Sequence, residues 1–270
     1  MALFNDKKVT KFIPLDKKRI EEELLARGIT LRTEVYDLIP STNTAALEFA
    51  RENPDRCAIF LAEAQSAGSG RLGRRFHSPE GAGLYMTLLI YPEGVKCDGV
   101  WLTTLAAVAL RRAVKNLTPL DPKIKWVNDL YIDGKKLAGI LARASLDEKG
   151  GARHLLIGIG INVYDAPLPE DIRETATSIE AAGGGRIDRN ALAAEITKEL
   201  FSALKESPDT LIAEYKNASL VLGKRIKVIE ADGEYYATAT DITDSGELIL
   251  TKDDKKRVIL STGEVSIRDF

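Results

Sequence analysis

The feature that most constrains the fold is Gly68–Arg75, an eight-residue segment with three glycines and three arginines. It follows Ala58–Ala64, an apolar run with the composition of a buried strand. Glycine lets the backbone approach a ligand closely or move, and arginine supplies a permanent planar charge that suits phosphate. The segment therefore predicts a loop after a strand, one that closes over an anionic small molecule.

The same segment satisfies Gly-x-Gly-x-x-Gly, the turn that opens a helix in dinucleotide-binding folds. A helix is not expected here, because Pro79, Gly81 and Gly83 follow closely. The ribose-binding acid expected about 20 residues further on would fall in the apolar run Leu84–Ile90. A Walker phosphate loop is excluded, because no Gly-Lys-Ser/Thr follows. A solvated surface loop that carries charge only for solubility remains an alternative.

Hydrophobic periodicity predicts helices and strands in mixed order up to residue 217. The expected helices are Leu15–Arg27, Ala45–Arg51, Gly99–Leu117, Asn190–Lys205 and Thr210–Asn217. The expected strands are Val35–Ile39, Ala58–Ala64, Leu84–Tyr91, Lys125–Ile132, Lys136–Ala144 and Leu155–Val163. Asp133-Gly134, between the fourth and fifth strands, is a strong signal for a β-hairpin.

From Lys224 onward the pattern changes to short strands separated by turn residues. The expected strands are Arg225–Glu230, Tyr235–Ile242, Glu247–Thr251 and Lys256–Leu260. Such a run of short strands at the end of a longer chain predicts a separate small β-barrel domain.

Charge and composition exclude several classes of protein. With 38 basic and 40 acidic residues, the formal net charge of -2 provides no overall basic field for nucleic acid or membrane binding. The apolar runs are shorter than the roughly 20 residues that span a bilayer. Residues Met1–Lys8 lack a secretory apolar region, and Cys57 and Cys97 are the only cysteines, so a cytoplasmic location is expected. His77 and His154 are interpreted as structural histidines with satisfied hydrogen bonds rather than zinc ligands.

A second group of polar residues lies on either side of the predicted hairpin turn. Lys125-Trp126-Val127-Asn128-Asp129 precedes the turn, and Lys136-Leu137-Ala138-Gly139 follows it. The hairpin predicts that Lys125, Asn128, Asp129 and Lys136 converge on one pocket. Ordinary surface charge near a turn is the alternative. Trp126 and the apolar second strand favour a hairpin with one buried side.

In the order of these motifs the chain resembles the biotin–protein ligases. The resemblance is carried by Ser41-Thr42-Asn43, Ala62–Gln65 with Gly68–Arg75, Lys125–Asp129 with Lys136–Gly139, Gly158–Asn162, and Ser261–Ser266 as a closing strand. It covers about Thr33 to Phe270. It implies an α+β fold, in which a mixed-sheet biotin/lipoate ligase-type catalytic domain precedes a small C-terminal Src-homology-type β-barrel. The expected divisions are a helical lead-in at 1–32, the catalytic domain at 33–222 and the barrel at 223–270.

The resemblance also implies an activity. Members of the family join biotin to ATP, release pyrophosphate, hold biotinyl-5′-adenylate and pass biotin to one lysine of a carboxylase carrier domain. Biotin, ATP, Mg²⁺ and a biotin carboxyl carrier domain are therefore the expected ligands and partner. The protein is expected to be a monomer or a homodimer, with Leu155–Val163 as a candidate dimer contact. About 32 residues precede the core, too few for the helix-turn-helix domain of some members, so no DNA binding is expected.

The resemblance assigns roles to individual residues. Lys136 is expected to bridge the biotin carboxylate and the α-phosphate, Arg71 and Arg74 to contact phosphate, and Asp129 to orient or deprotonate the acceptor lysine. The expected biotin-binding residues are Ser41, Thr42, Asn43, Gln65, Gly68, Ser69, Gly70, Arg71, Lys136 and Gly139. The expected nucleotide-binding residues are Arg71, Arg74, Arg75, Phe76, Trp126, Asn128, Lys136 and Asn162. No side chain is assigned as a metal ligand. From its residue types alone, Ser41-Thr42-Asn43 also fits a helix cap.

Two positions depart from the family's familiar pattern. Ser69 stands where many members carry the first arginine of Gly-Arg-Gly-Arg, which implies a weaker hold on the adenylate. Val127 replaces a common proline and is interpreted as a packing variation. A lipoate–protein ligase or octanoyl transferase, whose catalytic folds are related, is the alternative enzyme. A nucleic-acid module that uses the basic loop is the non-enzymatic alternative. The loop is expected to be disordered in the empty enzyme and ordered with biotin or adenylate bound.

Overall fold

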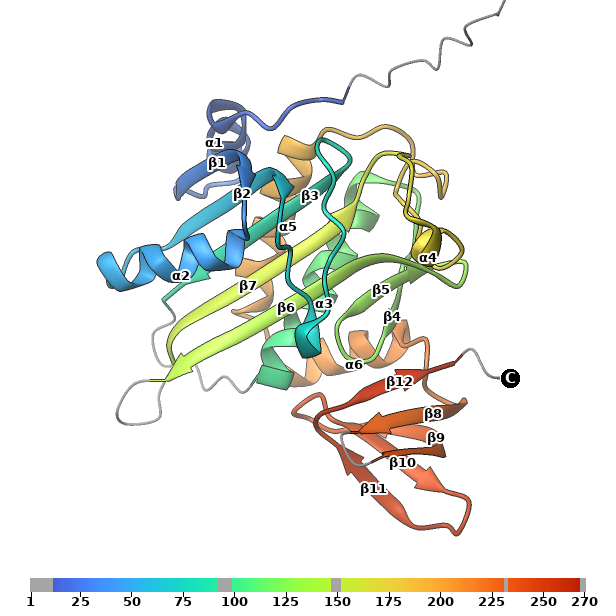
Figure 1. The fold of residues 1–270 in the computed structure, drawn as a ribbon. Helices are drawn as coiled ribbons and strands as arrows, with labels where there is room; N and C mark the ends of the chain where they lie inside the picture. The colour runs from blue at the N-terminus through green and yellow to red at the C-terminus, as the bar shows by residue number, and fades with distance from the viewer. Residues whose placement is uncertain (1–11, 92–98, 147–151, 231–232, 268–270) are drawn as a thin grey trace, which may run out of the picture.

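The computed structural model describes residues 12–91, 99–146, 152–230 and 233–267. Its larger part is a seven-stranded sheet in the order β1-β2-β3-β7-β6-β5-β4 (Figure 1). The strands are β1 (Arg32–Ile39), β2 (Ala58–Gln65), β3 (Gly83–Ile90), β4 (Lys123–Lys125), β5 (Asp129–Ile132), β6 (Lys135–Leu146) and β7 (Ala152–Asn162). β1 and β2 are parallel and every other neighbouring pair is antiparallel, so the sheet is mixed.

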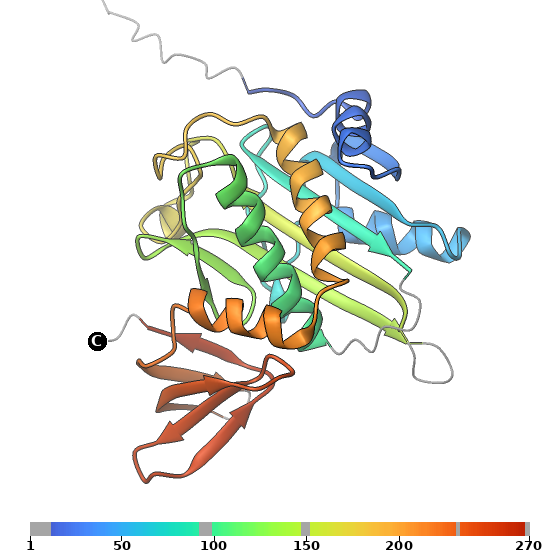
Figure 2. The same ribbon diagram turned by 180° about the vertical axis from the view of Figure 1, so that it is seen from behind.

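Helices cover both faces of this sheet. The helices are α1 (Lys17–Ala26), α2 (Thr42–Glu52), α3 (Gly99–Leu117), α4 (Glu170–Arg173), α5 (Arg189–Ala203) and α6 (Pro208–Ala218). α3 and α5 lie side by side across one face (Figure 2), and α2 lies on the other face. Every residue of β3 is buried, as expected for a strand covered on both faces. α1 adds the buried Ile20 and Leu24 to the same core, so this N-terminal helix packs onto the larger part.

Polar side chains just before α2 and α6 cap the first turns of these helices. Ser41 caps α2 by accepting a hydrogen bond from the Asn43 backbone N–H. Ser207 caps α6 in the same way, with Pro208 at the first helical position, where its missing N–H costs nothing. Except for α4, which was not predicted, the helices were predicted within a few residues of these bounds, because apolar periodicity and capping residues agree locally.

The smaller part is a five-stranded antiparallel sheet in the order β11-β10-β9-β8-β12. Its strands are β8 (Arg225–Glu230), β9 (Gly233–Ile242), β10 (Leu248–Lys252), β11 (Arg257–Leu260) and β12 (Glu264–Ser266). α6 lies beside this sheet (Figures 1 and 2), α3 also meets it where Thr104 faces Gly246, and β12 is the expected closing strand. Within the described residues, the outer strands β11 and β12 do not pair with each other.

The predicted strand Lys125–Ile132 is wrong as a single element. The chain leaves β4 after Lys125, turns through residues 126–128 and enters β5 at Asp129. Tertiary hydrogen bonds hold this turn: the Trp126 indole donates to the Gly246 carbonyl at 3.0 Å, and the Tyr215 hydroxyl donates to the Val127 carbonyl at 3.1 Å. Because those partners are distant in sequence, local periodicity had no signal for the break.

The β5–β6 hairpin itself is confirmed. Asp133 and Gly134 form its turn, and both have positive φ, at 47° and 76°. This is the backbone that a two-residue hairpin requires and that Asp-Gly readily adopts. The hairpin places Asp129 and Gly139 opposite each other on β5 and β6.

Two other expectations need correction. β7, proposed as a dimer contact, pairs with β3 on one side and β6 on the other, so the edges of the large sheet are β1 and β4. His154 is buried, but neither ring nitrogen has a hydrogen-bond partner within the described chain. It packs against the Tyr91 ring, and burial lowers its pKa. Its hydrogen bonds are therefore unsatisfied rather than satisfied.

Some expectations fall outside what the structure describes. Residues 1–8, on which the expectation of no secretory segment rests, and Cys97, one of the two cysteines, lie outside the described residues. No helix among the described residues is long and apolar enough to cross a membrane.

Candidate active site

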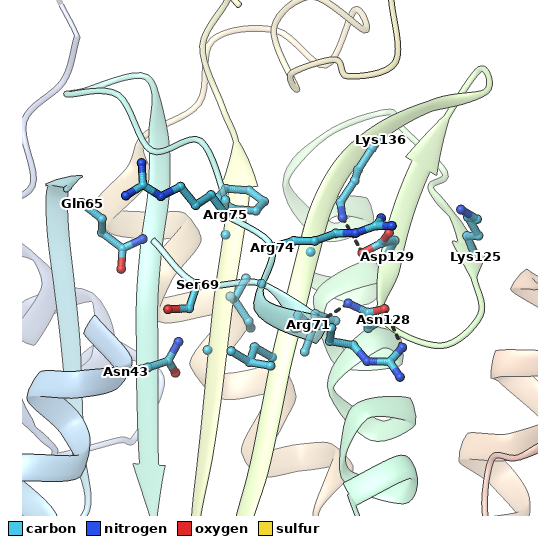
Figure 3. A pocket seen from close by; sticks show the side chains of 18 of the residues that line it. Asn43, Gln65, Ser69, Arg71, Arg74, Arg75, Lys125, Asn128, Asp129 and Lys136 are labelled. Carbon is cyan, nitrogen blue, oxygen red and sulfur yellow. Dashed lines mark hydrogen bonds and ion pairs between the residues drawn. The ribbon is translucent and has the colours of Figure 1, made fainter. Parts of the chain in front are cut away.

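One cavity lies over the middle of the large sheet, beneath the glycine–arginine loop, residues 68–75 (Figure 3). From the sequence-predicted residues it brings together Thr42, Asn43, Gln65, Ser69, Gly70, Arg71, Arg74, Arg75, Phe76, Trp126, Asn128, Asp129, Lys136 and Gly139. Lys125 lines it too, so the predicted convergence around the hairpin is confirmed. Ser41 is not in its lining and is used as the cap of α2, while Gly68 and Asn162 line neighbouring cavities.

The loop forms a small closed turn over the cavity. The Gly70 N–H donates to the Arg74 carbonyl at 2.7 Å, and the Phe76 N–H donates to the Gly68 carbonyl at 2.9 Å. A short 3-10 helix, η1 (Arg71–Gly73), lies between them instead of the longer helix of a dinucleotide-binding turn. A Cβ at Gly68 would lie 2.6 Å from the Phe76 carbonyl oxygen, so this position requires glycine.

One side of the cavity is cationic. The Lys136 ammonium lies 2.7 Å from Asp129 Oδ1, a buried oxygen, and both residues come from the β5–β6 hairpin. Arg71 Nη1 donates to Asn128 Oδ1 at 3.3 Å, which links the loop to the turn before β5 (Figure 3). Burial lowers the pKa of Arg71 from its ordinary value, and the negative charge of Asp129 opposes that shift. The guanidinium remains charged at neutral pH.

A third cation connects the loop to the small sheet. Arg74 donates two hydrogen bonds to Glu264 on β12, with nitrogen–oxygen distances of 2.8 and 2.6 Å. Glu264 and its neighbour Gly263 therefore complete one wall of the cavity. The sequence motif at 261–266 contained both residues, but only the packing of the two sheets shows that they reach the site.

The opposite side is mostly neutral and polar, with Arg75 beside Gln65 as its one labelled cation (Figure 3). The Thr42 backbone N–H donates to Gln65 Oε1 at 2.9 Å, and Gln65 Nε2 donates to the Ser78 hydroxyl at 3.0 Å. The Thr87 hydroxyl lies 2.8 Å from that of Thr42 and 3.2 Å from Asn43 Oδ1. Sequence reasoning missed Thr87, although a buried hydroxyl within an apolar strand was a usable signal.

The floor is made by strands β6 and β7, and its glycines leave space for side chains above them. A Cβ at Gly158 would lie 2.4 Å from Asn43 Oδ1, and one at Gly160 would lie 2.5 Å from the Phe76 ring. Both glycines stand in the motif 158–162 but were not assigned to the site. Because these glycines have no Cβ, the side chains of Asn43 and Phe76 can pack directly against the sheet.

A second cavity continues from the first along the hairpin. The two measure about 140 and 630 Å³, and they share Arg74, Phe76 and Lys136 in their walls. Leu168 and Ile172, from the segment around α4, add apolar surface to the larger one. A ligand with two parts, joined near Lys136, fits this arrangement.

Two residues expected to bind the nucleotide, Trp126 and Asn162, use their side-chain N–H groups in hydrogen bonds to backbone carbonyls. The Trp126 indole N–H is bonded to Gly246, and Trp126 is 3% exposed, so its polar group supports the turn. Asn162 Nδ2 donates to the Thr177 carbonyl at 2.9 Å, although the residue still lines the larger cavity. Among the described residues, no group of three or more His, Cys, Asp or Glu side chains is arranged to hold a metal ion.

Comparison with known proteins decides the family. Residues 35–162 match the biotin/lipoate A/B protein ligase family, and residues 221–268 match the biotin protein ligase C-terminal domain. The bifunctional ligase/repressor BirA of Bacillus subtilis is 32% identical over 244 residues, which are 86% of this chain and 75% of that protein. The biotin–[acetyl-CoA-carboxylase] ligase of Mycobacterium tuberculosis is 31% identical over 262 residues, 93% of this chain and 95% of that protein.

The chain belongs to the biotin–protein ligases.

The architecture of this ligase agrees with that assignment. The structure of the Aquifex aeolicus biotin protein ligase in complex with biotin and ATP superposes with a TM-score of 0.75 at 25% identity, covering 87% of this chain and 97% of that one. The predicted fold class and enzyme class are therefore confirmed. The short helix η1 and the mixed sheet do not match a dinucleotide-binding fold.

Proposed function

We propose that this ligase condenses biotin with ATP to biotinyl-5′-adenylate and pyrophosphate, and then transfers biotin to one lysine of a biotin carboxyl carrier domain. The observation that carries the proposal is the division of the cavity. Neutral amides and hydroxyls lie on one side, where Arg75 is the added cation beside Gln65, and Lys136, Arg71 and Arg74 lie on the other (Figure 3). Biotin has the same division, because its ureido ring is neutral and its carboxylate is anionic.

Biotin is oriented by this polarity. Its ureido group needs donors and acceptors without charge, which Asn43, Thr42 and Gln65 supply. The glycine floor at 158 and 160 leaves room for the rings. The carboxylate then points toward the hairpin, where the Lys136 ammonium lies.

Adenylation is the first chemical step. The biotin carboxylate oxygen attacks the α-phosphorus of ATP, the bond from that phosphorus to the β-phosphate bridging oxygen breaks, and pyrophosphate leaves. Lys136 would touch the carboxylate and the α-phosphate and so stabilise the charge that grows between them, an effect worth about 3 kcal/mol. Arg71 and Arg74 would add charge-assisted hydrogen bonds to phosphate, each worth about 1.5–3 kcal/mol.

ATP would occupy the larger cavity. Its phosphates would lie near the shared wall, and the base would lie toward Phe76 and the apolar Leu168 and Ile172. The carboxylates beside the phosphates are Asp129 and Glu264, and both are in ion pairs. Mg²⁺ would therefore be held mainly by the phosphates of ATP, where it supplies charge neutralisation for pyrophosphate departure.

Transfer is the second step. The acceptor lysine amine attacks the carbonyl carbon of the mixed anhydride, the bond to the AMP oxygen breaks, and an amide forms. Asp129 would receive the proton that the amine loses, since it lies at the same wall as Lys136. The loop would open to admit the carrier and close to keep water from the anhydride. We propose a monomer or a homodimer as the functional form. We place the reaction in the cytoplasm, where ATP is made available.

The test is mass spectrometry of a biotin carboxyl carrier domain after incubation with the ligase, biotin and MgATP. We expect a gain of one biotinyl group on one lysine, absent with Lys136→Ala. Lipoate in place of biotin separates the related lipoate ligase activity. A carrier that gains lipoate and not biotin would overturn the proposal, as would no gain of either.

A further inference from the structure

We propose that Lys136 is aimed into the site by a bulge in β6, and that residues 175–177 hold this bulge in place. We call residues 175–177 the strap. This inference rests on the proposed role of Lys136 in adenylation. It identifies the strap as a positioning element that acts through Lys136.

The bulge is visible in the pairing of β5 with β6. Asp129 pairs with Gly139, but the register shifts by one residue before Tyr131 pairs with Lys136. Leu137 is therefore an extra residue on β6 with no counterpart on β5. Bulges of this kind re-aim a side chain at the cost of a local break in the ladder.

The extra residue decides the face on which Lys136 lies. In a regular strand, residues three apart point to opposite faces, so Lys136 would point away from the face of Gly139 and Asp129. Here Leu137 and Ala138 are both fully buried, and the alternation is reversed beyond them. The Lys136 ammonium consequently lies 2.7 Å from Asp129 Oδ1, and a Cβ at Gly139 would lie 3.3 Å from Lys136 Nζ.

The strap occupies the place that β7 leaves at this end of β6. The last β6–β7 pair is Ala138 with Ile161. Beyond it, the Lys136 N–H donates to the Thr175 carbonyl at 2.8 Å, and the Thr177 N–H donates to the Lys136 carbonyl at 2.9 Å. Both backbone hydrogen-bonding groups of Lys136 are therefore fixed by the strap, in a short parallel bridge.

The strap is tied to the wall of the larger cavity. The N–H groups of Thr175 and Ala176 donate to the Ile172 carbonyl at 3.0 and 2.9 Å, and Ile172 lines that cavity. Asn162, at the end of β7, donates its side-chain amide to the Thr177 carbonyl. Hydrogen bonds therefore connect Ile172 of α4 to the backbone of Lys136 through the strap.

Loosening the strap should therefore slow adenylation more than it weakens binding. Without the bond from the Thr177 N–H, β6 can slip to regular pairing, and Lys136 then turns from Asp129 toward the other face. Among the described residues, Asn43 and Gln65 make no hydrogen bond to the strap, so their contacts with biotin should persist. The affinity for biotin should fall by a smaller factor than adenylation, because only the contact of its carboxylate with Lys136 is lost.

The test uses Thr177→Pro, which removes that N–H, and Ala166→Pro as a control in the same segment but outside the strap. For Thr177→Pro we expect the kcat of biotin-dependent pyrophosphate exchange to fall on the order of 10- to 100-fold. The KM for biotin, and the rate of transfer to carrier from supplied biotinyl-5′-adenylate, should each change by a smaller factor than this kcat. Equal losses in both half-reactions would indicate general damage and overturn the inference.

A double-mutant cycle separates action through Lys136 from any other effect. In a Lys136→Ala background, Thr177→Pro should cause no further loss of exchange beyond about two-fold. Multiplying losses would overturn the inference. If Thr177→Pro unfolds below the assay temperature, Asn162→Ala takes its place in the same cycle, because it releases the strap from β7. Since Asn162 also lines the larger cavity, the KM for ATP is measured as well, and a loss confined to that KM would overturn the inference. Exchange by the unaltered ligase tests the proposed function independently of these variants.

Discussion

Substitution of Gly158 by alanine is expected to weaken biotin binding while leaving the fold intact. Gly158 is buried on β7, and an added Cβ would lie 2.4 Å from Asn43 Oδ1 and 2.7 Å from Asn43 Nδ2. Ordinary contact begins near 3.4 Å. The Asn43 amide must therefore retreat by 3.4 − 2.4 = 1.0 Å, and it can do so because it is the end of a flexible side chain.

A retreat of that size removes Asn43 from hydrogen-bond distance to a ligand on the floor of the cavity. A buried polar group left without its partner costs about 1–3 kcal/mol. Applied to the ureido group of biotin, this corresponds to a Kd raised about 5- to 150-fold. Alanine is favoured over glycine in a strand by roughly 0.5–1 kcal/mol, so the free energy of unfolding should not fall by much.

The measurement is isothermal titration of biotin into the native protein and each variant. Gly99→Ala is the matched control, because a Cβ there meets nothing within 4 Å. Adding Gly158→Ala to Asn43→Ala should cause little further loss, since the displaced group is already absent. An unchanged Kd for Gly158→Ala, or losses that add in the double variant, would refute this account of the pocket floor.

Three further predictions concern the supports around the site. Trp126→Phe leaves the buried Gly246 carbonyl without its donor and should lower the free energy of unfolding by about 1–3 kcal/mol in urea denaturation, whereas an unchanged value would contradict the role of that bond. Glu264→Gln should weaken the pair with Arg74, which is 67% exposed at its side chain, so stability should change by less than about 1 kcal/mol. Trypsin should nevertheless cleave after Arg74 faster, and an unaltered rate would show that Glu264 does not hold the loop. For His154, burial lowers the pKa below 6.5 in the folded state, so the unfolded chain binds the proton more readily and stability is lost as pH falls through that value. His154→Phe should remove this loss, seen as a Tm advantage over the native protein that grows from pH 8 to pH 5; a constant Tm difference would contradict it.

Local sequence was sufficient to predict those helices and turns whose structure depends mainly on their own residues. The bounds of α3 were predicted to the residue, because a long apolar run encodes one buried helix. Asp133-Gly134 predicted its hairpin, because few residue pairs accept positive φ at two successive positions. Prediction failed at residues 126–128, where the hydrogen-bond partners come from α6 and the small sheet.

For the candidate site, the sequence by itself determined which chemical groups are available: a glycine–arginine loop, a cationic hairpin and neutral polar residues at the start of α2 and the end of β2. Residue type sets the charge and hydrogen-bonding capacity of a side chain, so these properties can be predicted without knowledge of the fold. Only the tertiary structure decided how these groups are arranged. It brings Glu264 onto Arg74, places Asn43 against Gly158, and turns Lys136 to the face of Asp129 through one extra residue in β6. Each of these depends on register or on contact between elements far apart in the chain, and a one-residue change in register reverses the face that a strand presents.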